Sequence, residues 1–208
     1  LNFNIKTGST VKLLNRNFEL GQNSKLNVES GGTIDFDYAS GTPLAVTASG
    51  SQTGSVFDAK VGGKLLINSL VGISSEGTAT GNVQTATRTY GAAKYHYVGT
   101  ANQITGTGQP AIVGDLVSDN SNLVTLSNAV TVNGKLEVIK GILDLNSKVT
   151  QGSSSTVKID DTATLRITGT STFPTGFTTH TIANNSIVDY AGTTQAIAAV
   201  LSPGYGKL

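Results

Sequence analysis

Two acidic pairs are the residues in this sequence with the most evident chemical potential. Asp35 and Asp37 are two residues apart, so on a strand they share one face, where two carboxylates are suited to binding Ca²⁺ or to beginning a lyase site. Asp160 and Asp161 are adjacent and are expected in a turn. A calcium site needs about six to eight oxygen ligands, and the sequence has no Asp-x-Asp-x-Asp-Gly loop. We therefore expect all four carboxylates to be solvated.

The histidines form no recognisable constellation. His96 lies between two tyrosines and His180 between two threonines, and neither has an Asp or Cys partner nearby in the sequence. The absence of cysteine excludes disulfides, thiolate metal sites and cysteine nucleophiles. Gly106-Thr107-Gly108 lacks the third glycine and the following helix of a phosphate-binding loop. The sequence thus predicts no metal site, no cofactor and no enzymatic activity.

The densest group of aromatic and basic side chains lies between residues 88 and 97. It consists of Arg88, Tyr90, Lys94, Tyr95 and Tyr97. Because Tyr and Arg are enriched where proteins bind partners, Arg88, Tyr90, Tyr95 and Tyr97 are candidates for contact with a glycan or a protein. The alternative, which we favour for Tyr95 and Tyr97, is burial between stacked repeats.

The elements that must position these residues are short runs of alternating apolar and polar residues. Such alternation is typical of strands with one buried face. The runs in the most regular region are Leu123–Leu126, Ala129–Val132, Leu136–Ile139, Ile142–Leu145, Val157–Ile159 and Ala163–Ile167. Gly, Asn, Asp and Ser separate them, and only Thr194–Leu201 has helical propensity. The chain is therefore predicted to be all-β.

The spacing of these runs favours a stacked repeat. Equivalent leucines recur at Leu123, Leu143 and Leu165, and Leu136 and Val157 are separated by a similar interval. A period of this size predicts a right-handed parallel β-helix (β-solenoid) with about 20–22 residues per coil. The alternative is an antiparallel β-sandwich, which also has regular short strands.

The repeat is degenerate but extends over the whole chain. SKLNVESGGTIDFD (24–37) resembles GKLEVIKGILDLNS (134–147), and GKLLINSLVGISS (63–75) is a looser copy. Residues 39–62 and 72–118 are richer in Gly, Thr and Ala and are interpreted as longer coils with excursions. No charged or Pro-rich spacer divides residues 1–208, so we predict a single β-solenoid domain.

The period also predicts which residues lie side by side in neighbouring coils. Moving along the chain by one coil places Leu143 against Leu165 and Leu136 against Val157, all facing inward. A step of 22 residues also places Asp144 beside Arg166, and a step of 21 places Glu137 beside Lys158, both on the outer face as opposite charges within contact distance.

Composition narrows the class of protein. The net charge of +1 and the 13% of charged residues argue against nucleic acid as a partner, because phosphate binding needs a clustered basic surface. No apolar run approaches the roughly 20 residues of a membrane helix. The sequence begins at Leu1 and contains no Met, so we expect it to be a fragment of a longer repetitive protein.

Three segments share phrases that point to a lineage. They are EGTATGNVQTATRTY (76–90), YHYVGTANQITGTGQP (95–110) and NLVTLSNAVTVNGKLEVIKGILDLNS (122–147), and VDYAGTTQAIAA (188–199) echoes the second. These segments resemble the repeat region of large secreted, cell-surface adhesin-like proteins of Bacteroidetes. The resemblance implies a stalk or passenger segment, export of the type IX secretion kind and an extracellular location. It also implies that Thr162, in Asp161-Thr162-Ala163, is a candidate O-glycosylation acceptor.

From these features we predict a structural or adhesive segment, a rigid stalk or filament-forming element. Its partners would be an extracellular glycan or protein, or a second copy joined end to end. The alternatives are a carbohydrate-active enzyme of the polysaccharide lyase kind, and a glycan- or ice-binding module with outward threonine rows. An enzyme needs ionisable residues that converge in one groove, whereas the charges here are few and scattered.

Overall fold

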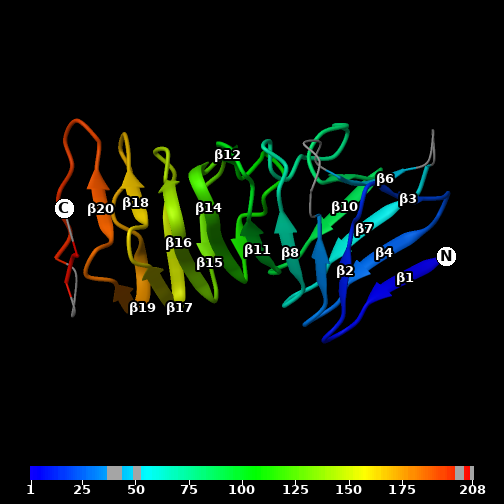
Figure 1. Ribbon diagram of the computed structural model, residues 1–208, viewed down its shortest axis with the longest axis horizontal. Helices are drawn as coiled ribbons and strands as arrows, with labels where there is room; N and C mark the ends of the chain where they lie inside the picture. The colour runs from blue at the N-terminus through cyan, green and yellow to red at the C-terminus, as the bar shows by residue number, and fades with distance from the viewer. Residues whose placement is uncertain (37–43, 49–52, 200–203, 207–208) are drawn as a thin grey trace.

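Every regular element that the computed structural model assigns is a β-strand. The structure describes residues 1–36, 44–48, 53–199 and 204–206, and over these residues it contains twenty strands and no helix. The strands follow one another along the long axis of the molecule, with the two chain ends at opposite ends (Figure 1). All strand pairings described between them are parallel. The prediction of an all-β chain is confirmed, and the antiparallel sandwich is wrong.

One stack of strands runs through most of the described chain and is called the central stack. It is formed in order by β2 (Thr10–Lys12), β5 (Thr33–Asp35), β8 (Lys64–Ile67), β11 (Lys94–Tyr97), β14 (Asp115–Thr125), β16 (Lys135–Asp144), β17 (Thr150–Ile159) and β19 (Thr175–Ile182). Each of these strands pairs only with the strands before and after it in this order, or with the flanking stacks described next.

Strands that precede a central strand in sequence form the leading stacks. The first is β1 (Asn2–Ile5), β4 (Lys25–Val28), β7 (Val56–Ala59) and β10 (Thr87–Tyr90), and the second is β13 (Ile112–Val113), β15 (Val130–Val132) and the beginning of β17. Strands that follow a central strand form the trailing stacks. The first is β3 (Phe18–Leu20), β6 (Val46–Ala48) and β9 (Val83–Gln84), and the second is β12 (Gln103–Ile104), the ends of β14 and β16, β18 (Thr164–Ile167) and β20 (Ile187–Tyr190).

The predicted register is confirmed in the second half of the chain. Leu143 pairs with Leu165, Asp144 with Arg166, and Leu136 with Val157. The interval between Leu123 and Leu143 does not match the register, because Leu143 pairs on its other side with Val124. A one-residue shift of this kind arises at an irregularity in β14, where the register with β16 changes between Asp119 and the following residues.

The predicted period does not hold in the first half. Ile34 pairs with Leu65 and Leu65 with Tyr95, so the chain between these central strands is about half as long again as one predicted coil. These longer repeats coincide with the Gly-, Thr- and Ala-rich regions in which excursions were predicted. Val11 pairs with Ile34, so the first repeat is also slightly longer than expected.

The similar segments 24–37 and 134–147 do not occupy equivalent places in the fold. Leu26 of KLNV lies on β4 in the first leading stack, whereas Leu136 of KLEV lies on β16 in the central stack. The central strand in the first copy is β5, which carries Ile34. Residues 63–75, the looser copy, do match residues 134–147 in the fold, since Leu65 of KLLI is in the same stack as Leu136. Period-2 alternation shows which side of a strand is buried but does not say in which stack the strand lies.

One pair of predicted strands is a single strand in the structure. Leu136–Ile139 and most of Ile142–Leu145 are joined in β16, which ends at Asp144, and the chain changes stack at Gly141 without leaving the sheet. Gly141 has a φ of 64°, and a Cβ at this position would collide with the carbonyl oxygens of Asn120 and Asn122. Glycine is therefore required at this corner, because other residues rarely adopt such a φ.

The core lies on the inward side of the stacks and consists of rows of stacked aliphatic and aromatic side chains. One row of the central stack runs from Ile34 through Leu65, Tyr95, Leu116 and Leu136 to Val157, and each of these side chains is at most 1% exposed. Burial of these rows is the main source of stability that a repeat structure of this kind has.

Candidate functional site

The aromatic and basic cluster predicted between residues 88 and 97 is largely inside the protein. Tyr95 and Tyr97 on β11 are fully buried, and Arg88 on β10 is 8% exposed. The expectation that these three side chains form an exposed partner-binding patch is therefore wrong, and the favoured alternative of burial is confirmed for the two tyrosines. Alternation in the segment TRTYGAAKYHY does not by itself show which alternate set of residues faces the core.

The two buried tyrosines bond to backbone carbonyl groups. The Tyr95 hydroxyl donates to the carbonyl of Gly91 at 2.9 Å, and the Tyr97 hydroxyl donates to that of Thr105 at 3.1 Å. Burial raises the pKa of both phenols above the ordinary value. Tyr90 is half-buried against Phe57, with ring centroids 6.0 Å apart, and its buried hydroxyl has no hydrogen-bond partner among the described residues. These phenols are structural and remain neutral.

The remaining predicted site residues are dispersed over the molecule. Asp35 lies beside Lys12 in register, and Asp37 lies outside the described residues. Asp161 accepts a hydrogen bond from the Asn185 side chain at 3.1 Å in an exposed turn. His180 is on the last central strand, where it lines a shallow hollow of about 210 Å³ beside Phe173. The part of the chain that the structure describes has no group of three or more His, Cys, Asp or Glu side chains that could hold a metal ion.

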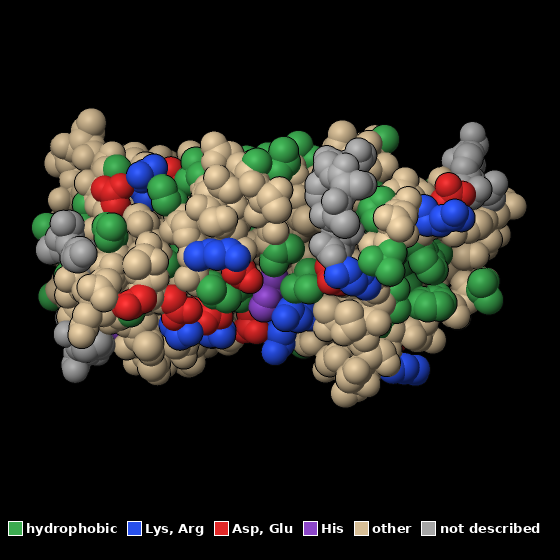
Figure 2. Space-filling view, viewed as in Figure 1, with side chains coloured by type: hydrophobic (Ala, Val, Ile, Leu, Met, Phe, Trp, Pro, Cys, Tyr) green, Lys and Arg blue, Asp and Glu red, His purple; other side chains and the backbone are tan. Residues whose placement is uncertain are grey.

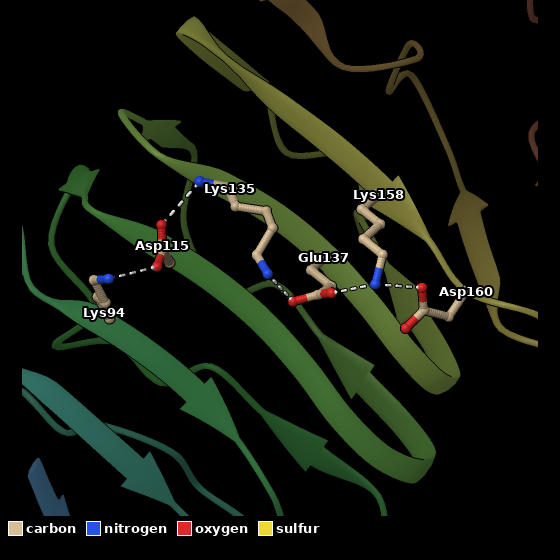
Figure 3. Close-up of polar contacts among 6 residues, drawn as sticks. All are labelled: Lys94, Asp115, Lys135, Glu137, Lys158 and Asp160. Atoms are coloured by element: carbon tan, nitrogen blue, oxygen red, sulfur yellow. Dashed lines mark hydrogen bonds and ion pairs between the residues drawn. The ribbon is translucent and has the colours of Figure 1, made fainter. Parts of the chain in front are cut away.

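The outer face of the central stack carries a row of alternating charges. Figure 2 shows acidic and basic side chains gathered along the middle of one face, with a histidine among them. The close-up in Figure 3 shows six of these residues crossing from β11 to the end of β17. They are Lys94, Asp115, Lys135, Glu137, Lys158 and Asp160, and we call them the charge row.

The ion pairs of the charge row link neighbouring repeats. The Glu137 carboxylate lies 2.5 Å from the Lys135 ammonium and 2.8 Å from that of Lys158, which is also 2.7 Å from Asp160. Asp115 pairs with Lys94 at 3.4 Å, and it accepts the Lys135 backbone N–H at 2.9 Å. The predicted contact between Glu137 and Lys158 is thus confirmed. Arg166, predicted beside Asp144, forms its ion pair with Asp189 one repeat further along, at 2.8 Å.

The charge row is poorly suited to acid–base catalysis. Burial acts to raise the pKa of Glu137, but hydrogen bonds from Lys135 and Lys158 outweigh it and lower the pKa. Hydrogen bonds to Asp160 and Glu137 raise the pKa of Lys158 to about 12. A general acid or base works best with a pKa near the working pH. The pKa of Glu137 and the pKa of Lys158 are both moved away from neutral pH, so both side chains stay charged there.

His96 lies on the same face of β11, in the row that includes Glu137. Burial lowers its pKa from the ordinary 6.5 to about 4, with a smaller contribution from Lys64. Lys135 acts in the same direction, whereas Asp115 and Glu137 oppose the shift. His96 is therefore neutral at pH 7 and is not a proton donor there.

We expect the free energy of unfolding to decrease as the pH falls from about 6.5 to about 4. In this window the unfolded chain protonates His96 while the folded chain does not, so protons favour unfolding. Urea titrations across this range should show the decrease in the wild type and in E137Q, and it should be absent in H96Q. Glu137 affects stability at lower pH, because a carboxylate with a lowered pKa loses its stabilising effect only as the pH falls below about 4.5. A decrease of equal size in H96Q would contradict the assignment.

The structure reveals two glutamines that sequence analysis passed over. The Gln103 side chain donates to the carbonyls of Ile67 and Ser69 and accepts the Gly99 N–H. Gln195, near the C-terminal end of the described chain, makes three equivalent bonds. Its partners are the Ile167 and Ser171 carbonyls and the Gly192 N–H. We call each of these arrangements a glutamine clamp.

The glutamine clamp explains why one short sequence pattern occurs twice in the chain. The segments that follow Tyr97 and Tyr190 both read x-Gly-Thr and then reach a Gln, and in each case the Gln closes the corner after a strand. The Gln side chain bonds to a carbonyl of the preceding repeat that also accepts the N–H of the residue just after the strand. The Ile67 carbonyl accepts the Val98 N–H in the first clamp, and the Ile167 carbonyl accepts the Ala191 N–H in the second. The echo between the two segments was therefore a signal for a structural site.

Comparison of the chain with protein-family models, with curated proteins and with solved structures gives no match. No helix in the described residues has the length and apolarity needed to cross a membrane.

Proposed function

We propose that this chain is a structural or adhesive segment of a secreted bacterial cell-surface protein, and that its strands wind as a closed, right-handed parallel β-solenoid. The solenoid acts as a stiff stalk that carries binding parts away from the cell. The adhesin-like repeats that the sequence resembles support this proposal, as do the extended shape and the parallel stacking.

The observation that carries the proposal is the central stack, which continues from β2 to β19 along the long axis (Figure 1). A load applied at the two ends acts along this axis, and successive ladders of backbone hydrogen bonds transmit it from one repeat to the next. The charge row, the glutamine clamps and the buried rows all join one repeat to the next. This distribution of contacts favours a mechanical role over chemistry at one point.

A polysaccharide lyase is the alternative function, and its chemistry finds less support. The carboxylates of the charge row are neutralised by lysines, and Lys158 is held protonated. A lyase needs a basic residue able to abstract a proton near neutral pH. A glycan-binding module remains the second alternative, supported by exposed threonines on β19, namely Thr175, Thr178, Thr179 and Thr181.

The proposal includes Thr162 as a glycan acceptor. The residue is exposed, in the turn between β17 and β18, and its φ of 64° is unusual for a β-branched residue. A hydroxyl at this position is accessible to a modifying enzyme. Intact-mass measurement of protein from its native source, compared with T162V, tests this part separately.

Two measurements test the stalk against the enzyme. Small-angle scattering should give an elongated particle, and incubation with plant, algal and bacterial polysaccharides should give no new reducing or unsaturated ends. Turnover of any polysaccharide that is lost in D35N or D160N would overturn the proposal in favour of the enzyme. A compact scattering profile would contradict the rod.

A further inference from the structure

The stacks are interrupted near the middle of the described chain, and one loop spans the interruption. The first leading stack ends at β10 and the first trailing stack at β9, and neither pairs with the second stacks that begin at β13 and β12. Over the described residues, only the central stack passes through this region, by the pairing of β8 with β11 and of β11 with β14. Residues 69–82, between β8 and β9, are called the strap.

The strap is bonded to the second half of the molecule. Ile73 is fully buried, its N–H donates to the carbonyl of Thr105 at 3.0 Å, and its carbonyl accepts the Gly108 N–H at 2.8 Å. The Leu70 carbonyl accepts the Ile104 N–H at 2.9 Å. These partners belong to β12 and the residues directly after it, so this side of the strap extends the second trailing stack.

Arg88 bonds the strap to the first half. It is on β10, the last strand of the first leading stack, and it pairs in register with the buried Phe57. Its guanidinium donates to three strap carbonyls, those of Ser74 at 2.9 Å, Ser75 at 2.6 Å and Thr78 at 2.6 Å. The Arg88 N–H also donates to the Glu76 carboxylate at 2.8 Å.

A buried guanidinium that donates to several carbonyl groups holds them in a fixed arrangement. Its planar fork of donors satisfies several orphan carbonyls together, and a lysine cannot reproduce this geometry. Removing it leaves the carbonyls of residues 74–78 without these donors, while Ile73 still holds the strap to the second half. The connection that fails is the one between residues 74–78 of the strap and the first half, whereas Asn82 at the end of the strap stays bonded to Asn68 and Leu44.

We propose that Arg88 and the strap form a latch between the two halves of the molecule. Closed, the latch makes both halves one stiff unit. Open, it leaves them joined by the central stack, the Gln103 clamp and the bonds of Asn82, so that they bend more freely. The latch is a property of the fold and does not depend on the function proposed above.

Cleavage by a glutamate-specific protease tests the latch, because Glu76 lies in the exposed part of the strap. We expect cleavage after Glu76 to be about tenfold faster in R88A than in the wild type, since local opening controls proteolysis. Cleavage after Glu19 and Glu29 should be unchanged, and so should all rates in the control R166A, which removes a half-buried ion pair far from the strap in the sequence. Millimolar methylguanidinium should restore the wild-type rate in R88A by occupying the carbonyl cage.

A distance measurement completes the test. The chain has no cysteine, so spin labels at V61C and N133C report on the two halves alone. R88A should broaden the distance distribution, and methylguanidinium should narrow it again. An unchanged distribution together with unchanged cleavage after Glu76 would overturn the proposal, as would equal acceleration at all glutamates. If R88A does not fold, R88K, which retains the charge with fewer donors, is subjected to the same measurements and the same criteria.

Discussion

Replacing Leu143 with alanine should lower the free energy of unfolding by about 2–5 kcal/mol. Leu143 is 1% exposed and lies between Val124 and Leu165 in an inward row of the second trailing stack. The substitution removes contacts with both neighbouring repeats and leaves a cavity that regular backbone ladders on either side prevent from collapsing. The loss is therefore expected toward the upper part of this range.

Urea denaturation of L143A, followed by circular dichroism, measures the effect. The matched control is L14A, because Leu14 is 62% exposed and its truncation removes little buried surface. We expect the control to lie within about 0.5 kcal/mol of the wild type. Equal losses in the two variants would contradict the inward row as the main source of stability.

The second half of the fold was the part most open to prediction from sequence. Apolar and polar residues there alternate over short runs and the repeats are nearly equal in length, so a step of 22 residues gave the neighbour of Leu143 and a step of 21 gave those of Leu136 and Glu137. The slip from Val124 to Leu123 came from the irregularity in β14, which adds residues without changing the apolar pattern. Periodicity does not reveal such an insertion.

The first half was harder because its repeats differ in length and its core contains polar residues. Arg88 occupies a core-facing position beside Phe57, where an alternation rule expects an aliphatic side chain. Asn68 and Asn82 are also buried, and they bond to each other and to backbone groups at the corner after β8. Such side chains are stable inside only because partners distant in sequence satisfy them. The sequence does not display these partners.

The charge row shows the opposite case, in which the sequence predicted the contact but not its consequence. The pairing of Glu137 with Lys158 followed from the repeat period of the apolar residues on either side. The additional pairs with Lys135 and Asp160, which keep the row neutral and chemically quiet, depend on side chains at strand ends. The structure was needed to see that one carboxylate serves two lysines.

Replacing Gln103 with leucine should cost roughly 2–3 kcal/mol, whereas the same change at Gln195 should cost under about 1 kcal/mol. Leucine has nearly the same volume, so the difference measures hydrogen bonding and not packing. In Q103L the Ile67 and Ser69 carbonyls still accept the N–H groups of Val98 and Gly72. The buried Gly99 N–H, in contrast, loses the acceptor that Gln103 provided.

Burial decides which of the two clamps is costly to remove. Gln103 is 1% exposed and also accepts a bond from Asn120, whereas Gln195 and its partner Gly192 are only half-buried. Water can therefore satisfy the Gly192 N–H in Q195L, but it cannot reach Gly99 without opening the corner. Denaturant titrations of the two variants, with hydrogen exchange at both glycines, provide the comparison. Equal losses would mean that the bonds of the clamp, and not the orphaned N–H, set the cost, and fast exchange at Gly99 in Q103L alone would support the orphaned donor.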